Sequence, residues 1–299
     1  MRILAIIFVI ICLWSCSDKL DSPVDNQIEK VNNFVIRWRG QVPKECKDVI
    51  RNILQNMVYV RGGIYIMGPT LEQKEFARQN EYPTMYAQID DFYIASHEVT
   101  PQEYWCIIGG RENDGLSENY LSISWYDWRF FIDVLNDMTN LEFDFPTECQ
   151  WEYAAKGGEY SKGFVYPGSN SLEDVRSLSD IEGSLVPNEL GLYNMTDLRS
   201  EWCKDYYEDY NTNTFIENRF VSLGKYMVVR GGNWYCSGET KKYLTDALPS
   251  DNIFGHFRTS GSILNPFDYR YCRTTARSWY SPSTNSNYIG CRLVINEIK

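Results

Sequence analysis

The sequence predicts one mixed α+β domain that is built from early helices, irregular strands and long loops. Helical periodicity of apolar residues is concentrated in the first half of the 299-residue chain, whereas the second half carries short apolar runs that break at glycines. Aromatic residues make up 15% of the chain, with 22 Tyr and 9 Trp, and large rings of this kind fill gaps between irregular loops. We therefore expect little regular secondary structure over the domain, residues 43–299.

The first element of this domain is an amphipathic helix over residues 43–57, which Pro43 opens. Its apolar side chains share one stripe: Cys46, Val49, Ile50, Ile53, Leu54 and Met57. In residues 57–68, apolar side chains alternate around Gly62-Gly63, and this pattern predicts a hairpin. Residues 86–100 predict a second pair of strands.

Two helices follow in the next forty residues. Residues 101–108 predict a short helix that Thr100 caps. The clearest helical pattern covers 124–140, where Ser124 or Asp127 is the expected cap. Its buried face is expected to carry Trp128, Phe131, Ile132 and Leu135.

The last regular helix and the later strands are marked by their boundaries. Residues 145–158 predict a helix that begins with a Thr147–Gln150 capping box and stops at two glycines. Loops are expected over 164–200, followed by an apolar strand within 226–236 and a closing strand over 288–295.

The N-terminus predicts export and lipid attachment. An apolar run from Ile3 to Trp14 is too short to span a membrane and fits the core of a signal peptide. The motif Leu-Trp-Ser-Cys, which ends at Cys16, resembles the bacterial lipobox, in which the cysteine is acylated. We expect a signal peptide over 1–15, lipidated Cys16, and a polar tether over 16–42. The alternative is an ordinary secretory signal that contains this cysteine by chance.

Composition and cysteine usage exclude several function classes. The net charge is −11 and no block of Lys or Arg stands out, so we expect no nucleic-acid partner. Apart from Cys12 and Cys16, seven cysteines remain, and an odd number leaves at least one free thiol in a single chain. Their spacing is not a zinc pattern, and the chain has only two histidines, His97 and His256. We therefore expect no metal site built from Cys and His ligands.

Eight ordered motifs resemble the formylglycine-generating enzyme or sulfatase-modifying factor family across residues 55–296. They are MVYVRGGIYIMG, FYIASHEVTPQEY, SISWYDWRFFIDVLN, FPTECQWEYAAKGG, PNELGLYNM, EWCKD, VVRGGNW and IGCRLV. The resemblance implies an irregular C-type-lectin-like fold with bound calcium. It also implies, for the founding enzymes, a copper-dependent oxidation of a sulfatase cysteine to formylglycine. Many bacterial members are lipoproteins of unknown or structural role.

The implied copper site is incomplete in this chain. Copper(I) prefers two thiolates, and Cys236 stands at the position of the family's first thiol. The second thiol, expected five residues later, is Lys241, and the family's pocket serine is Asn233. An insertion at about 237–268 follows. We therefore expect no copper unless the insertion brings Cys236 to Cys272.

Two other cysteines stand at family positions. Cys272 lies in a Cys-Arg pair that many bacterial relatives share, and Cys291 replaces the phenylalanine of the family's closing Gly-Phe-Arg. If their strands are neighbours, we expect a disulfide between Cys272 and Cys291, and the alternative is two buried thiols. A family arginine before the helix at 145–158 is replaced by Asp144, which reverses a charge and requires different partners.

The resemblance also implies a calcium site near the motif GLYNM. The implied ligands are the side chains of Asn194 and Glu201 and the backbone carbonyls of Asp197 and Arg199. Asp197 replaces a glycine of the family pattern, and Ser200 replaces a tryptophan. The alternative is a solvated acidic loop.

Three functions follow from these residues. The first is a non-catalytic binding or scaffold module, anchored through Cys16 in the bacterial cell envelope, with the outer membrane as the expected location. Its partner would be an envelope protein, a peptide or a glycan, met by the insertion at 237–268. The second is an oxygen-dependent oxidase that uses Cys236 in a modified copper site. The third, a different enzyme on the same fold, finds no pairing of nucleophile and base in the sequence.

Overall fold

The computed structural model describes residues 27–71, 73–109, 121–175, 186–196, 198–211, 215–217, 220–233 and 269–296. Several expected functional residues lie outside these ranges: the signal peptide over 1–15, Cys16, Asp197, Cys236, Lys241 and the insertion at 237–268. None of the helices in the described ranges has the length and apolar character needed to cross a membrane.

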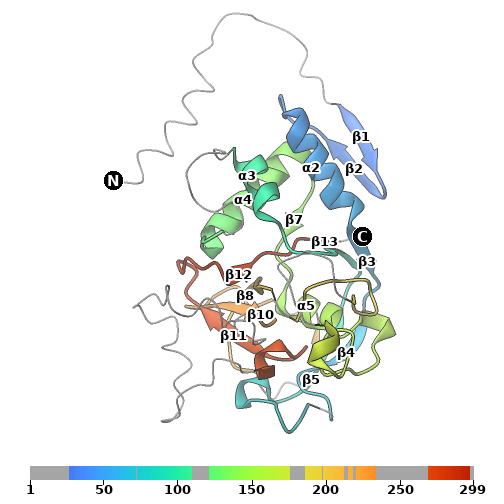
Figure 1. The fold of residues 1–299 in the computed structure, drawn as a ribbon, viewed down its shortest axis with the longest axis vertical. Coiled ribbons are helices and arrows are strands. Elements are labelled where there is room, and N and C mark those ends of the chain that lie inside the picture. The colour runs from blue at the N-terminus through green and yellow to red at the C-terminus, as the bar shows by residue number, and fades with distance from the viewer. Residues whose placement is uncertain are drawn as a thin grey trace, which may run out of the picture.

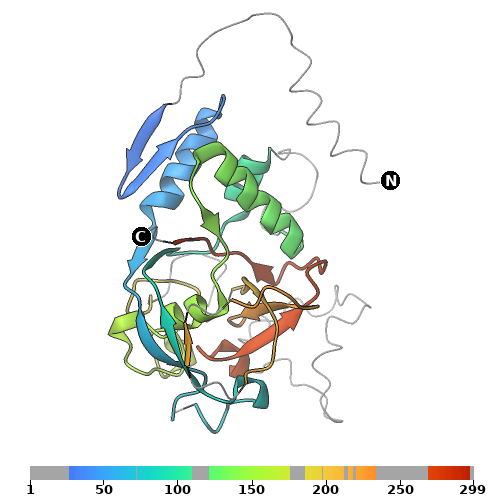
Figure 2. The same cartoon turned by 180° about the vertical axis from the view of Figure 1, so that it is seen from behind.

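The described elements form a helical end and a sheet end (Figure 1). At the helical end, α2 (Lys44–Gln55), α3 (Pro101–Ile108) and α4 (Trp125–Thr139) pack together. Their buried side chains form one hydrophobic cluster that continues between the helices and the neighbouring strands. The view from behind shows the same division, with these three helices at one end of the molecule (Figure 2).

A hairpin precedes these helices and belongs to the fold. β1 (Ile28–Val31) pairs antiparallel with β2 (Phe34–Arg37). Alternate apolar side chains of this segment pack into the helical cluster: Val31, Phe34, Ile36 and Trp38. The tether that the sequence predicted over 16–42 is therefore wrong in its second half, because these apolar residues are buried rather than solvated.

The helix boundaries follow the predicted caps. The side-chain oxygens of Thr100, Ser124 and Thr147 accept a hydrogen bond from the backbone N–H three residues later, and each completes a capping box. They open α3, α4 and α5 (Glu148–Ala155), respectively. Ser124 rather than Asp127 is the cap residue of α4, and Asp127 supplies the return bond. The buried face of α4 carries the four predicted apolar residues. That of α2 carries Cys46, Ile50, Ile53 and Leu54, whereas Val49 is only partly buried and Met57 begins β3.

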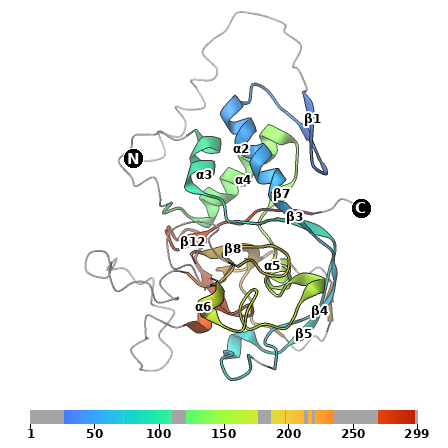
Figure 3. The same ribbon diagram turned by 45° about the vertical axis from the view of Figure 1, so that its right-hand side comes forward.

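Residues 57–67 and 85–95 form one long two-stranded ribbon along a side of the molecule (Figure 3). β3 (Met57–Val60) pairs with β6 (Phe92–Ala95), and β4 (Gly63–Met67) pairs with β5 (Met85–Ile89). Both pairings are antiparallel. They share one register, because the Gly63–Ile89 pair lies three residues beyond the Val60–Phe92 pair on each of the two strands.

This ribbon corrects the two hairpins that the sequence predicted. β3 and β4 do not pair with each other, and neither do β5 and β6. Gly62 is needed for a close approach between the two chains, since a Cβ atom there would lie 2.2 Å from the carbonyl oxygen of Ile89. Its N–H donates to the Asp91 side chain at 2.7 Å, which fixes the crossing from one sheet to the next.

The sheet end contains three sheets, and the ribbon belongs to two of them. The first has the order β3-β6-β13-β7, with β13 (Val294–Asn296) and β7 (Phe143–Asp144). The second has the order β11-β10-β8-β12 and comprises β8 (Ser200–Tyr206), β10 (Met227–Arg230), β11 (Arg277–Tyr280) and β12 (Ile289–Gly290). β12 runs parallel to β8, and the other pairs of that sheet are antiparallel. The third joins β4, β5 and β9 (Phe215–Glu217).

The closing strand predicted over 288–295 divides into β12 and β13, which belong to different sheets. The residues between them remain paired, because the carbonyls of Cys291 and Leu293 accept from the N–H groups of Val99 and Ala95, both at 2.8 Å. Short elements complete the described chain: the helix α6 (Leu172–Val175) and 3₁₀ turns at Gln79–Glu81, Gly158–Tyr160 and Tyr269–Cys272. Every residue of α5 is buried, so this helix forms the centre of the sheet end.

Candidate functional site

The described rim of the expected copper site lies where β10 ends. The side-chain amide of Asn233 donates to the hydroxyl of Ser200 at 3.2 Å, so the residue in place of the pocket serine is joined to the first residue of β8. Cys272 approaches the same place, since a Cβ atom on Gly232 would lie 2.5 Å from the Cys272 sulfur. Cys236 and Lys241 follow in sequence but lie outside the described residues.

A buried cluster of two arginines and two glutamates lies beneath this rim. Arg230, the last residue of β10, donates to Glu148 at 3.0 Å and to Glu152 at 2.6 Å. Arg277, the first residue of β11, binds both oxygens of Glu148 at 2.7 and 2.8 Å. Both glutamates come from α5, so one helix holds two neighbouring strands. We call Arg230, Arg277, Glu148 and Glu152 the central ion cluster.

The charges of the central ion cluster are matched inside the protein. Burial alone would raise the pKa of Glu152, but Lys156 and Arg230 outweigh it and lower that pKa. Burial opposes the charge of Arg230 as well, yet Tyr210 and the glutamates raise its pKa well above the ordinary value. Glu152 is therefore ionised at neutral pH, and Arg230 keeps its charge, which is the state expected of a structural cluster.

The segment after residue 268 has a second buried anchor. Arg273 binds Glu81 through two hydrogen bonds, of 2.9 and 2.5 Å, and both side chains are almost fully buried. Together with Arg277, this pair fixes the chain directly after the Tyr269–Cys272 turn. The chain on both sides of residues 234–268 is thus attached to the core by buried ion pairs.

The expected calcium ligands are only partly described. Asn194 is buried with a positive φ of 59°, Arg199 lies against Gly290, and Asp197 is outside the described residues. Glu201, buried in β8, accepts two bonds from Arg292 at one oxygen, of 3.0 and 2.6 Å. Its other oxygen accepts from Arg292 at 2.9 Å and from Trp151 at 2.7 Å.

These four bonds use the acceptor capacity of the Glu201 carboxylate, and Arg292 neutralises its charge. A calcium ion needs the same lone pairs. One of the two side-chain ligands of the predicted calcium site is therefore already engaged by Arg292 and Trp151. Over the residues that the structure describes, no group of three or more His, Cys, Asp and Glu side chains could hold a metal ion.

The predicted disulfide between Cys272 and Cys291 is wrong. Cys291 carries a free, fully buried thiol in the hydrophobic cluster that joins the helices and strands. Cys272 packs in a separate cluster with Tyr166 and Val175. The two residues are not on neighbouring strands, because Cys272 ends the 3₁₀ turn Tyr269–Cys272 and Cys291 lies between β12 and β13. Burial raises the pKa of Cys291 and of Cys203 well above the ordinary value, so both thiols stay protonated.

Asp144, where the family arginine is replaced, has two cationic partners. One carboxylate oxygen accepts from Arg129 of α4 at 2.6 Å, and the other accepts from Lys204 of β8 at 2.8 Å. The charge reversal is thereby compensated by residues that the sequence did not point to. Only the three-dimensional packing of α4, β7 and β8 reveals this relationship.

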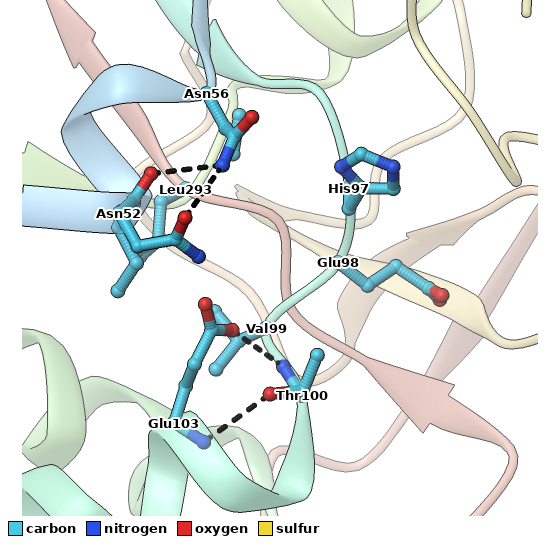
Figure 4. A pocket seen from close by; sticks show the side chains of 10 residues that line it. Asn52, Asn56, His97, Glu98, Val99, Thr100, Glu103 and Leu293 are labelled. Atoms are coloured by element: carbon cyan, nitrogen blue, oxygen red, sulfur yellow. Dashed lines mark hydrogen bonds between the residues drawn. The ribbon is translucent and has the colours of Figure 1, made fainter. Parts of the chain in front are cut away.

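A small polar pocket lies between the helical end and the sheet end, and sequence reasoning missed it. Its volume is about 280 Å³, and Figure 4 shows Asn52 of α2 and Asn56, which follows the end of α2, facing His97 and Glu103 across it. Glu103 is held by its capping bonds to Thr100, and His97 stacks on Tyr193 with ring centroids 4.8 Å apart. Burial, followed by the charge of Arg292, lowers the pKa of His97.

Comparisons with known proteins agree with this architecture. The sequence profile of the sulfatase-modifying factor enzyme 1-like domain matches residues 42–297. The chaperone protein LppX of Paenibacillus barcinonensis is 23% identical over 221 residues, which cover 54% of this chain and 76% of LppX. The formylglycine-generating enzyme of Streptomyces coelicolor is 28% identical over 112 residues, which cover 30% of this chain and 36% of the enzyme.

Among solved structures, Treponema denticola variable protein 1 has the same fold. Its TM-score is 0.58 at 18% identity, and the match covers 92% of this chain and 100% of that protein. The fold is thus the irregular, C-type-lectin-like α+β fold that the motifs implied.

Proposed function

Because the chain belongs to the sulfatase-modifying factor or formylglycine-generating enzyme family, we propose that it is a non-catalytic binding module of the bacterial cell envelope, anchored to the membrane through lipidated Cys16. Its partner is an envelope protein, a peptide or a glycan. The insertion at 237–268 is the surface that meets this partner.

The observation that carries the proposal is how the chain on either side of the insertion is attached. Arg230 and Arg277 bind the same carboxylate, Glu148, and lie opposite each other in the paired strands β10 and β11. A binding loop needs a rigid support, because ordering that support on binding would lower the affinity. This cluster supplies the support, and its four residues lie outside 234–268. The name of LppX, a chaperone protein, agrees with a role in protein binding.

The departures at the copper site support the absence of catalysis. Lys241 stands where the second thiol is expected, and a cation cannot replace a soft copper ligand. Asn233 stands in place of the pocket serine and is hydrogen-bonded to Ser200. Ionisable groups of the central ion cluster are paired with one another rather than open to a substrate.

Copper(I) titration of the purified protein tests this proposal directly. We expect weak binding that is unchanged in Cys236→Ser. Tight binding that Cys236→Ser and Cys272→Ser each abolish would favour the second candidate, an oxidase. That candidate rests on one observation, the position of the Cys272 sulfur beside Gly232 at the described rim of the site. The copper-loaded protein would then convert a sulfatase-derived cysteine peptide to formylglycine in the presence of oxygen.

The binding surface is tested by replacing residues 237–268 with a short Gly-Ser linker. We expect the variant to fold and to lose the envelope partners that cross-link to the native protein in cells. As a matched control, Glu173→Gln and Asp174→Asn change charges in α6 and should leave the cross-links intact. Retention of the cross-links in the linker variant would exclude the insertion as the binding surface.

Membrane attachment is tested by Cys16→Ser. The native protein should fractionate with membranes, and the variant should be soluble. A native protein that already fractionates as soluble would contradict the lipid anchor.

A further inference from the structure

Two cysteines of the helical end lie close enough to react with each other. Cys46 is on the first turn of α2 and Cys106 is on α3, sixty residues later in the chain. Their sulfur atoms are 3.6 Å apart, and the Cys46 thiol also donates to the backbone carbonyl of Cys106 at 3.0 Å. We propose that Cys46 and Cys106 form a disulfide that joins α2 to α3 when the protein meets a disulfide oxidant.

The required movement is small. A disulfide has an S–S distance of about 2.05 Å, so the two sulfur atoms must approach by about 1.5 Å. Both cysteines are on packed helices, and α2 contacts α3 directly. Side-chain rotation with a small shift of one helix closes this gap without a change of fold. Export of the protein, which the N-terminal sequence predicts, would place the pair in an oxidising compartment.

The two sulfur atoms differ in their access to a reagent. Cys46 is 5% exposed, whereas Cys106 is only partly buried. Burial, followed by the hydrogen bond with Cys106, raises the pKa of the Cys46 thiol to about 12. Cys106 is therefore the thiol that an oxidant reaches first, and Cys46 is the thiol that completes the bond.

The chemistry is a thiol–disulfide exchange in two steps. The Cys106 sulfur, after loss of its proton, attacks a disulfide RSSR and forms a mixed disulfide while one thiolate RS⁻ leaves. The Cys46 sulfur then loses its proton and attacks the Cys106 sulfur, which expels the second RS⁻. In total the two cysteines lose two electrons and two protons, and RSSR is reduced to two thiols.

The disulfide would link α2 to α3 and so stabilise the helical end. The stretch between the two cysteines contains the whole ribbon of β3–β6. Closing a loop of that length constrains the unfolded chain and stabilises the folded one. We expect the oxidised protein to melt at least about 5 °C above the reduced one.

Oxidised glutathione is the probe that tests the inference. After treatment of the purified chain, denaturation and alkylation, mass spectrometry should show two fewer reactive thiols and no retained glutathione. Peptide mapping should find Cys46 linked to Cys106, and dithiothreitol should reverse the link. Cys46→Ser should instead keep one glutathione on Cys106, whereas Cys106→Ser should carry none on Cys46.

Cys149→Ala is the matched control, because Cys149 is buried beside Met67 and takes no part in the pair. This variant should still form the link and show the rise in melting temperature. Three results would overturn the inference. They are a native chain that keeps both thiols, a stable glutathione adduct on its Cys106, or a link that joins Cys46 or Cys106 to another cysteine.

Discussion

Arg292 binds both carboxylate oxygens of Glu201 in the interior of the protein, and Trp151 adds a further hydrogen bond. Removal of one partner leaves the other charge buried without compensation. We expect Glu201→Gln to lower the free energy of unfolding by about 3–5 kcal/mol. Urea unfolding measures this loss.

An exposed pair provides the control for that experiment. Arg61 and Glu159 approach to 3.7 Å, and their side chains are 70% and 37% exposed. Glu159→Gln should therefore change the free energy of unfolding by less than about 1 kcal/mol. Equal effects of the two substitutions would show that the Glu201–Arg292 pair is not desolvated in solution.

Calcium removal gives the second prediction. Because Arg292 and Trp151 occupy the acceptor sites of Glu201, we expect a chelator to shift the melting temperature of the native protein by less than about 1 °C. Differential scanning fluorimetry with and without added calcium measures the shift. A large decrease on chelation that disappears in Asn194→Ala would instead support the calcium site that the family resemblance implies.

The third prediction concerns the central ion cluster. Glu148→Gln leaves Arg230 and Arg277 with one negative charge fewer between them, so we expect a loss of about 3 kcal/mol or more. The Gly-Ser replacement of residues 237–268 should cost far less, because β10 and β11 remain paired and anchored. Denaturant unfolding of both variants compares the two effects. A larger loss in the linker variant would show that the insertion contributes to the core.

His97 gives the fourth prediction, a dependence of stability on pH. Its folded pKa lies below the ordinary value of 6.5, so its neutral form is favoured by the fold. The corresponding stability is complete above pH 6.5 and is lost as the pH falls through the folded pKa. We expect His97→Asn to reduce the drop in melting temperature between pH 7 and pH 5. His256→Asn removes the other histidine of the chain, which lies outside the described residues, and an equal reduction in both variants would contradict a specific role of His97.

The helices and the family could be predicted from the sequence because their signals are local. The capping oxygens of Thr100 and Thr147 and the apolar stripe of α4 depend only on neighbours along the chain. The pairing of strands depended on distant residues. Alternation around Gly62-Gly63 indicated two strands correctly, but the partner residues of these strands were 18 to 38 positions away in the chain.

The predicted site was limited in the same way, because the partners of its residues are also distant in the chain. The position of Glu201 could be read from the family motif, yet its partner Arg292 lies 91 residues later in the chain. The cationic partners of Asp144 likewise come from α4 and β8. The pairing of Cys272 with Cys291 failed because it assumed neighbouring strands, whereas Cys272 lies in a 3₁₀ turn and packs in a different cluster from Cys291. Residue types indicated where charge is buried, but only the fold determined which charge compensates it.

The ribbon of residues 57–67 and 85–95 gives two sheets a single shared strand register. A deletion of one residue on either side of Gly62 could not be absorbed within one sheet, because the same pairing continues into the other. Every side chain beyond the deletion would turn to the opposite face. Evolutionary length changes should therefore avoid both of these segments and collect at 68–84, where the chain turns from one strand of the ribbon to the other.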